Sequence, residues 1–164
     1  MVLSTHAIVG AAIASLMPQH PALAFVCGIA SHFAIDAIPH SDYRLRSISV
    51  SRRSRSAITL NLSLVRDLAL LTFDAAVGLA VAVWLYVAPG SALAVLLGAT
   101  GAMLPDPLQV AYRLYPKEPL RTLQRFHRYI HSNRKLRSPL AVSSQLLFVL
   151  LTIAVTEALR GMWA

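Results

Sequence analysis

The residues best suited to chemistry in this chain are histidines and aspartates, several of which recur four residues apart. His32 and Asp36 have this spacing, which places both side chains on one face of a helix, about one turn apart. Pro39 ends such a helix and lets His40 and Asp42 fold back toward the same place. Because zinc is commonly held by histidine together with aspartate or glutamate, the segment predicts a metal site. A buried His–Asp pair that only packs helices is the alternative.

Four further residues extend this candidate site. His127 and His131 form a second histidine pair with helical spacing. Asp106 stands between two prolines in Leu104-Pro105-Asp106-Pro107, for which we expect a rigid, nonhelical turn. His6 begins the first apolar segment. The plain alternatives are solvated or headgroup-facing histidines and a simple helix stop at Asp106.

The complete set of candidate metal ligands is His6, His32, Asp36, His40, Asp106, His127 and His131. This set is too large for one four-coordinate ion. Either two ions bind, or some of these residues do not touch the ion and instead hydrogen-bond to the residues that do. Asp36 and Asp106 are also the candidate catalytic groups, zinc is the expected ion, and manganese is the alternative.

The composition indicates which elements position these residues. The chain has 164 residues, of which 56% are hydrophobic and 13% charged, against about 25% charged in ordinary soluble domains. A membrane span takes about 20 mostly apolar residues, and the candidate helices are about 6–17, 21–38, 64–88, 91–104 and 139–159. The sequence therefore predicts one all-α domain, residues 1–164, a polytopic membrane bundle of about five transmembrane segments. Gly10 and Gly28 should let the first two helices pack as a tight hairpin.

The net charge of +8 comes from cations that lie between the apolar segments, in basic loops 43–63 and 112–138. Of the 15 lysines and arginines, only Arg160 lies outside the stretches 44–66 and 113–137. This is the positive-inside pattern of a multi-pass membrane protein and argues against nucleic acid as a partner. We therefore expect the N-terminus and both basic loops to be cytoplasmic.

Part of the second basic loop has the pattern of an amphipathic helix. Leu120, Leu123 and Ile130 recur at helical spacing, with arginines on the other side. A soluble surface helix has the same period, but in a membrane protein this pattern favours a helix that lies on an anionic leaflet. Membrane lipid is therefore an expected partner.

The orientation taken from lysine and arginine alone gathers the candidate ligands. Five of the six histidines come out at the cytoplasmic end, and only His20 falls at the opposite face. Asp67 joins them at that end. Asp74 lies deeper, and three roles remain open for it: support for a ligand, a helix-packing hydrogen-bond acceptor, or part of a proton path.

These motifs together resemble the membrane-bound metal-dependent hydrolases of bacterial inner membranes. The matching residues are Thr5-His6 at a helix start, Ser31-His32-x3-Asp36, the helix end Leu104-Pro105-Asp106 and His127-Arg128-x2-His131-Ser132. The run from His32 to His40 is also similar to a zinc motif of secreted phospholipase C enzymes. The family's usual P-D-x-D-H run is here Pro105-Asp106-Pro107-Leu108-Gln109. The resemblance implies a hydrolase of the cell inner membrane.

Two classes of function follow. In the first, a divalent metal lowers the pKa of water to about 7 and supplies the nucleophile that attacks a phosphoester or ester at the headgroup level. A phospholipid-like substrate fits that location, and Arg44, Arg125 and Arg128 would bind its anionic group. In the second, the protein is not an enzyme, and it binds metal or serves as an accessory subunit of a larger membrane complex.

Overall fold

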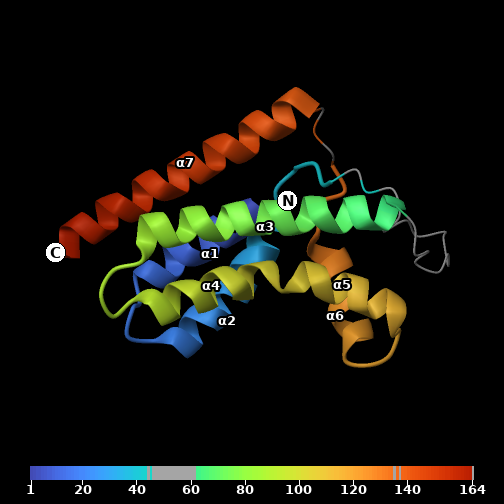
Figure 1. The fold of residues 1–164 in the computed structure, drawn as a ribbon, viewed down its shortest axis with the longest axis horizontal. Helices are drawn as coiled ribbons and strands as arrows, with labels where there is room; N and C mark the ends of the chain where they lie inside the picture. Colours follow the sequence, from blue (N-terminus) through green and yellow to red (C-terminus); the bar gives the residue numbers. More distant parts are fainter. Residues whose placement is uncertain (44, 46–61, 135, 137, 164) are drawn as a thin grey trace.

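The computed structural model describes residues 1–43, 45, 62–134, 136 and 138–163. Within these residues every regular element is an α-helix, which confirms the predicted all-α fold (Figure 1). Most of the predicted basic loop 43–63, including Arg44, lies outside the described residues. The helices are α1 (Leu3–Ser15), α2 (Pro21–Asp36), α3 (Leu62–Tyr86), α4 (Ala92–Met103), α5 (Pro105–Leu114), α6 (Leu120–Ile130) and α7 (Ser138–Trp163).

Helix α1 is enclosed by α2, α3 and α4, and α7 runs along the outside of this bundle (Figure 1). Small residues make the close packing possible. A Cβ added at Gly10 of α1 would lie 2.3 Å from the carbonyl oxygen of Gly98 in α4, and one added at Gly28 of α2 would lie 2.2 Å from the same oxygen. The two glycines that were expected to bring α1 against α2 therefore both pack against α4.

Two helices among the described residues are long and apolar enough to cross a membrane, namely α3 and the Pro139–Met162 part of α7. A third span results if α4 and α5, which meet at a bend of 46°, act as one. Helices α1 and α2 have only 13 and 16 residues, fewer than the about 20 that a full span takes. The structure thus supports a membrane protein, and the expectation of about five complete spans is not confirmed.

The chain does not leave the helical conformation after Pro105. Pro105 occupies the start of α5, where its missing N–H costs no intrahelical hydrogen bond, and Asp106 follows in the first turn. The expectation of a nonhelical turn at Asp106 is therefore wrong. The predicted loop 112–138 accordingly contains the end of α5 and all of α6, the latter being the amphipathic helix that the sequence predicts.

Helix α1 begins level with the middle of α3. Asp74 is twelve residues from either end of α3 and accepts hydrogen bonds from the Ser4 backbone N–H and the Ser4 hydroxyl, both at 2.8 Å, and from the Tyr43 hydroxyl. The N-cap residue of α1, Val2, makes no capping side-chain hydrogen bond, so Asp74 satisfies a free N–H of α1 from outside. Of the three roles left open for Asp74, the structure shows the helix-packing one.

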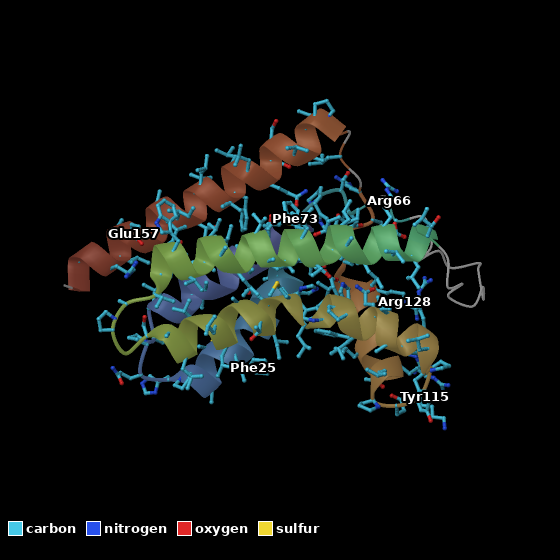
Figure 2. The ribbon with its side chains drawn as sticks, viewed as in Figure 1. Phe25, Arg66, Phe73, Tyr115, Arg128 and Glu157 are labelled. Carbon is cyan, nitrogen blue, oxygen red and sulfur yellow. The ribbon has the colours of Figure 1, made fainter. Side chains whose placement is uncertain are left out.

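The two ends of the molecule carry different charged side chains. Figure 2 shows Arg66 and Arg128 at the end where α5 and α6 lie, whereas Glu157 lies toward the other end. Glu157 is paired with Arg160 at 2.7 Å, so these two charges offset each other.

Candidate metal centre

The candidate ligands meet around Asp36, the last residue of α2, which is almost fully buried. The Nε2 atoms of five histidines surround its carboxylate, whereas His20 is exposed at the turn before α2. The predicted convergence of histidines is therefore present in the structure. His6 and His40 lie 3.4 and 3.6 Å from Asp36 Oδ1, and His127, His32 and His131 lie 3.2, 3.3 and 3.8 Å from Asp36 Oδ2.

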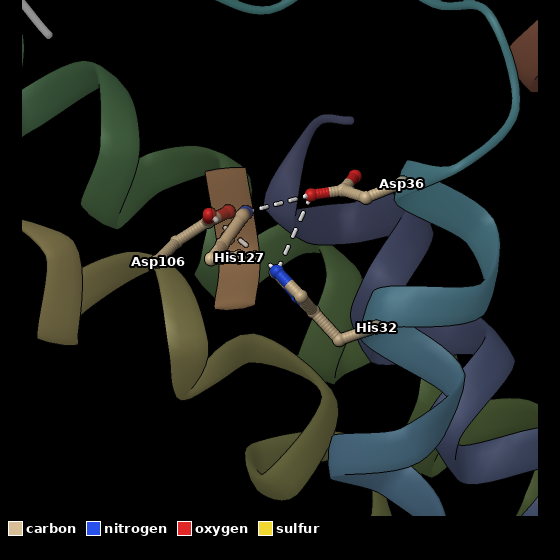
Figure 3. A group of neighbouring side chains, drawn as sticks. All are labelled: His32, Asp36, Asp106 and His127. Atoms are coloured by element: carbon tan, nitrogen blue, oxygen red, sulfur yellow. Dashed lines mark hydrogen bonds and ion pairs between the residues drawn. The ribbon is translucent and has the colours of Figure 1, made fainter. Parts of the chain in front are cut away.

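One group of ligand atoms is formed by His32, Asp36, Asp106 and His127, drawn in Figure 3. One nitrogen or oxygen of each residue lies within 4.8 Å of those of the others, so a single metal ion could reach all four. Helix α2 supplies the first two residues, α5 supplies Asp106, and α6 supplies His127. The ion would therefore join three helices.

A second group is formed by Asp36, His40 and His131, whose ligand atoms also lie within 4.8 Å of one another. Asp42 lies beside it, with its Oδ1 2.8 Å from His40 Nε2 and 3.6 Å from His131 Nε2. His6 belongs to neither of the groups found among the described residues. Its ring stacks on that of His32, with 4.1 Å between the centroids.

Three of these histidines have a ring orientation that is fixed by the backbone. The Nδ1 atoms of His32, His40 and His131 lie 2.8, 2.7 and 3.0 Å from the carbonyl oxygens of Ala102, Ile38 and Ser132. A carbonyl oxygen only accepts, so each Nδ1 must carry the hydrogen, and in a neutral ring Nε2 is then a bare lone pair. Metal-binding histidines typically have this arrangement.

The bare nitrogens face carboxylate oxygens, which also carry lone pairs. Between a neutral ring and a carboxylate such a contact is repulsive, and it becomes favourable when a cation lies between them or when the ring carries a second proton. Within the described structure, His32 Nε2, both ring nitrogens of His6 and His127 Nδ1 are buried and have no hydrogen-bond partner. Because an unsatisfied buried polar atom costs about 1–3 kcal/mol, these nitrogens fit a site that binds a cation.

Positive charge is favoured at the outer part of the cluster. The Met1 amino nitrogen lies 2.7 Å from Asp36 Oδ1 and 3.5 Å from Asp42 Oδ1. Burial opposes ionisation of Asp42, but hydrogen bonds from His131 and His40 hold its pKa well below the usual range. The hydrogen bond to Asp42 outweighs burial at His131 and raises its pKa. The carboxylates of this region are thus stabilised in their charged form.

Sequence reasoning missed Gln109. Its amide nitrogen lies 3.0 Å from Asp106 Oδ1 and 3.3 Å from His127 Nε2, and its amide oxygen accepts a hydrogen bond from Gln124 at 3.2 Å. Gln109 follows Asp106 by three residues, a spacing that places both on one face of a helix. Because a nonhelical turn was expected at Asp106, the helical spacing between Asp106 and Gln109 was not recognised.

The site opens to the outside along one edge. The side chains of Asp42, Asp106 and His131 are 34%, 26% and 25% exposed, while those of His6, His32 and Asp36 are at most 1% exposed. A reactant would therefore enter beside the first three residues.

The remaining polar residues named from the sequence lie elsewhere. Asp67 is buried in α3 and belongs to neither ligand group found in the described part of the chain. Arg125 and Arg128 are exposed on α6.

Comparisons with known proteins assign no family. No family model, no curated protein and no solved structure matches this chain.

Proposed function

We propose that the protein is a metal-dependent hydrolase embedded in the bacterial inner membrane, and that it cleaves a phosphoester or ester bond near the cytoplasmic face. The observation that carries this proposal is the group formed by His32, Asp36, Asp106 and His127, because it combines four ligand atoms with a partly open edge. Catalytic zinc sites have this combination of several protein ligands and an accessible position. The motif resemblance supports the same reaction class.

The proposed ion is zinc, with manganese as the alternative, since nitrogen and oxygen ligands suit both. A divalent ion at this place supplies Lewis acidity and lowers the pKa of water. Asp36 and His32 hold the ion's position, because both are buried and one face of α2 carries both. His6 packs on His32 and limits how far that ring can turn.

Asp106 is the proposed general base, acting through the carboxylate oxygen that would not hold the ion. It is the carboxylate of the first group that solvent reaches, and Gln109 orients it by donating a hydrogen bond to Oδ1. It would accept the proton that the attacking water loses. The new bond joins the water oxygen to phosphorus or acyl carbon. The bond from that atom to the alcohol oxygen of the leaving group breaks, and this oxygen takes the proton that Asp106 accepted.

The membrane placement is part of the proposal. The short helices α1 and α2 would form a further membrane-embedded hairpin beside α3, α7 and the bent α4–α5 pair. Helix α6 would lie at the interface, with exposed Tyr129 and Phe126 toward lipid and Arg125 and Arg128 among anionic headgroups. A phospholipid-like substrate is the class that this placement favours.

Purified full-length protein tests the proposal. It should carry stoichiometric Zn²⁺ or Mn²⁺ by elemental analysis and hydrolyse at least one member of a panel of phosphoesters and phospholipids. His32→Ala should bind less metal and lose turnover, whereas His20→Ala, a change at the exposed histidine, should retain the full metal content and turnover. Metal-free protein after gentle purification would exclude the proposal. Metal binding without hydrolysis of any panel member would instead favour a metal-binding or accessory subunit.

A further inference from the structure

We infer that the centre binds two divalent cations, and that Asp36 bridges them: one ion at His32, His127 and Asp106, the other at His40, His131 and Asp42. This inference deepens the proposed function and rests on its metal centre. It assigns to the second ion a set of residues that lies nearer the open edge.

The two ligand sets have the same composition. Each has two histidines and one aspartate of its own, and both include Asp36. Four nitrogen and oxygen ligands fill a tetrahedral site, so the attacking water would bind as a fifth ligand, as catalytic zinc permits. The two sets together account for every candidate ligand named from the sequence except His6, and they add Asp42.

Asp36 is placed to serve both sets at once. Its Oδ2 lies 3.3 Å from His32 Nε2 and 3.2 Å from His127 Nε2. Its Oδ1 lies 3.6 Å from His40 Nε2, and its Oδ2 lies 3.8 Å from His131 Nε2, so both oxygens reach the second set. Paired catalytic ions lie about 3.5–4 Å apart, a separation that one bridging carboxylate can serve.

The histidines of the second set have the ring orientation that is typical of metal ligands. Both His40 and His131 donate Nδ1–H to a backbone carbonyl, which leaves Nε2 as the lone pair. That lone pair faces Asp42 in both residues, at 2.8 and 3.6 Å. In their neutral form these two imidazoles and Asp42 present three ligand atoms to one place, where a divalent cation would bind.

The Met1 amino group is the competing cation. It lies on Asp36 Oδ1 and within 3.5 Å of Asp42 Oδ1. In the described structure its ion pairs are with these two carboxylates, whereas a metal ion would also take the Nε2 atoms of His40 and His131 as ligands. A second ion would share the carboxylates with this amine or displace it.

The test is metal stoichiometry in full-length protein, stripped with a chelator, reloaded with Mn²⁺ or Zn²⁺ and desalted. The wild type should retain about two ions per chain. His40→Ala and Asp42→Asn should each retain about one, as should His32→Ala, and His20→Ala should match the wild type. Size-exclusion chromatography should show that each variant remains monodisperse, and His40→Gln serves as the conservative replacement.

Electron paramagnetic resonance of the Mn²⁺-loaded protein gives an independent readout. Two ions bridged by Asp36 should give an exchange-coupled spectrum, which His40→Ala converts to that of an isolated ion. One ion per wild-type chain, or unchanged stoichiometry in folded His40→Ala and Asp42→Asn, overturns the inference. Hydrolysis with one bound ion would contradict this inference and leave the proposed function intact. Two bound ions without hydrolysis would support this inference and contradict the proposed function.

Discussion

Gly98 of α4 lies directly against Ala14 of α1: a Cβ added at position 98 would be 2.5 Å from the Cβ of Ala14 and 2.6 Å from the carbonyl oxygen of Gly10. Real side chains do not approach so closely. The backbones of α1 and α4 must therefore separate if residue 98 gains any side chain. Since α1 carries His6 and α4 leads into Asp106, this contact also sets the spacing of the site.

Gly98→Ala should consequently lower the stability of the bundle by about 1–3 kcal/mol, the usual cost of overpacking. Unfolding in mixed detergent micelles would measure the loss. Gly161→Ala in α7 is the matched control, because no described atom lies within 4 Å of the added Cβ. That control should be neutral or slightly stabilising. Equal effects of the two changes would contradict the packing argument.

Asp74 should be required for the N-terminal end of α1. Asp74→Ala removes the acceptor of three hydrogen bonds, two from Ser4 and one from Tyr43, each worth about 0.5–1.5 kcal/mol. We expect a lower melting temperature and weaker metal binding, since His6 follows Ser4 by two residues and its ring stacks on that of the proposed ligand His32. Glu157→Gln, which alters an exposed carboxylate of α7, should change neither. A stable Asp74→Ala protein with normal metal affinity would refute this role.

Gln109 should position Asp106. Gln109→Ala removes the hydrogen bond that the amide donates to Asp106 Oδ1 and should weaken metal binding about 10–100-fold, as the loss of a supporting partner typically does. Competition with a coloured chelator measures the affinity. Gln19→Ala, at the exposed turn after α1, provides the same change of residue type away from the site. Equal affinities of the two variants would show that Gln109 has no positioning role.

Metal should hold α6 in place. His127 links α6 to Asp36 of α2, and the backbone N–H of Ser132 donates to the Asp36 carbonyl at 2.8 Å. An ion present at 100 times its Kd stabilises the bound state by about 2.7 kcal/mol, which corresponds to about 100-fold slower amide exchange. Hydrogen-exchange mass spectrometry should show this slowing for α6 and not for the last turns of α7. Equal protection with and without chelator would contradict it.

The gathering of ligands was predictable because it depends on two one-dimensional patterns. Helical spacing places His32 beside Asp36, and the distribution of arginines brings the ends of distant helices to one side. The helix at Asp106 was not predictable in the same way, since Pro105 can either stop a helix or start one. Once that segment was taken as a turn, Gln109 had no place in the site.

The division of the ligands into two groups depends on tertiary contacts, which cannot be read from the spacing of residues along the sequence. His40 and His131 are 91 residues apart along the chain and share Asp36 only because α6 returns to α2. Likewise, the partner of Gly10 and Gly28 is Gly98, and small residues in an apolar segment do not reveal which helix they face. The role of Asp74 required the position of Ser4.

The shortness of α2 determines how deep the site lies. Its 16 residues span about 24 Å at 1.5 Å per residue, and Asp36 is the last of them. If the turn before α2 rests at one boundary of a hydrocarbon core about 30 Å thick, Asp36 lies about 6 Å short of the other boundary. For the proposed hydrolase, the bond to be cleaved would then have to descend below the headgroups, or the bilayer would have to thin locally to meet it. Lateral entry from the lipid would thus compete with entry from the aqueous side, and bilayer thickness itself would become a determinant of turnover.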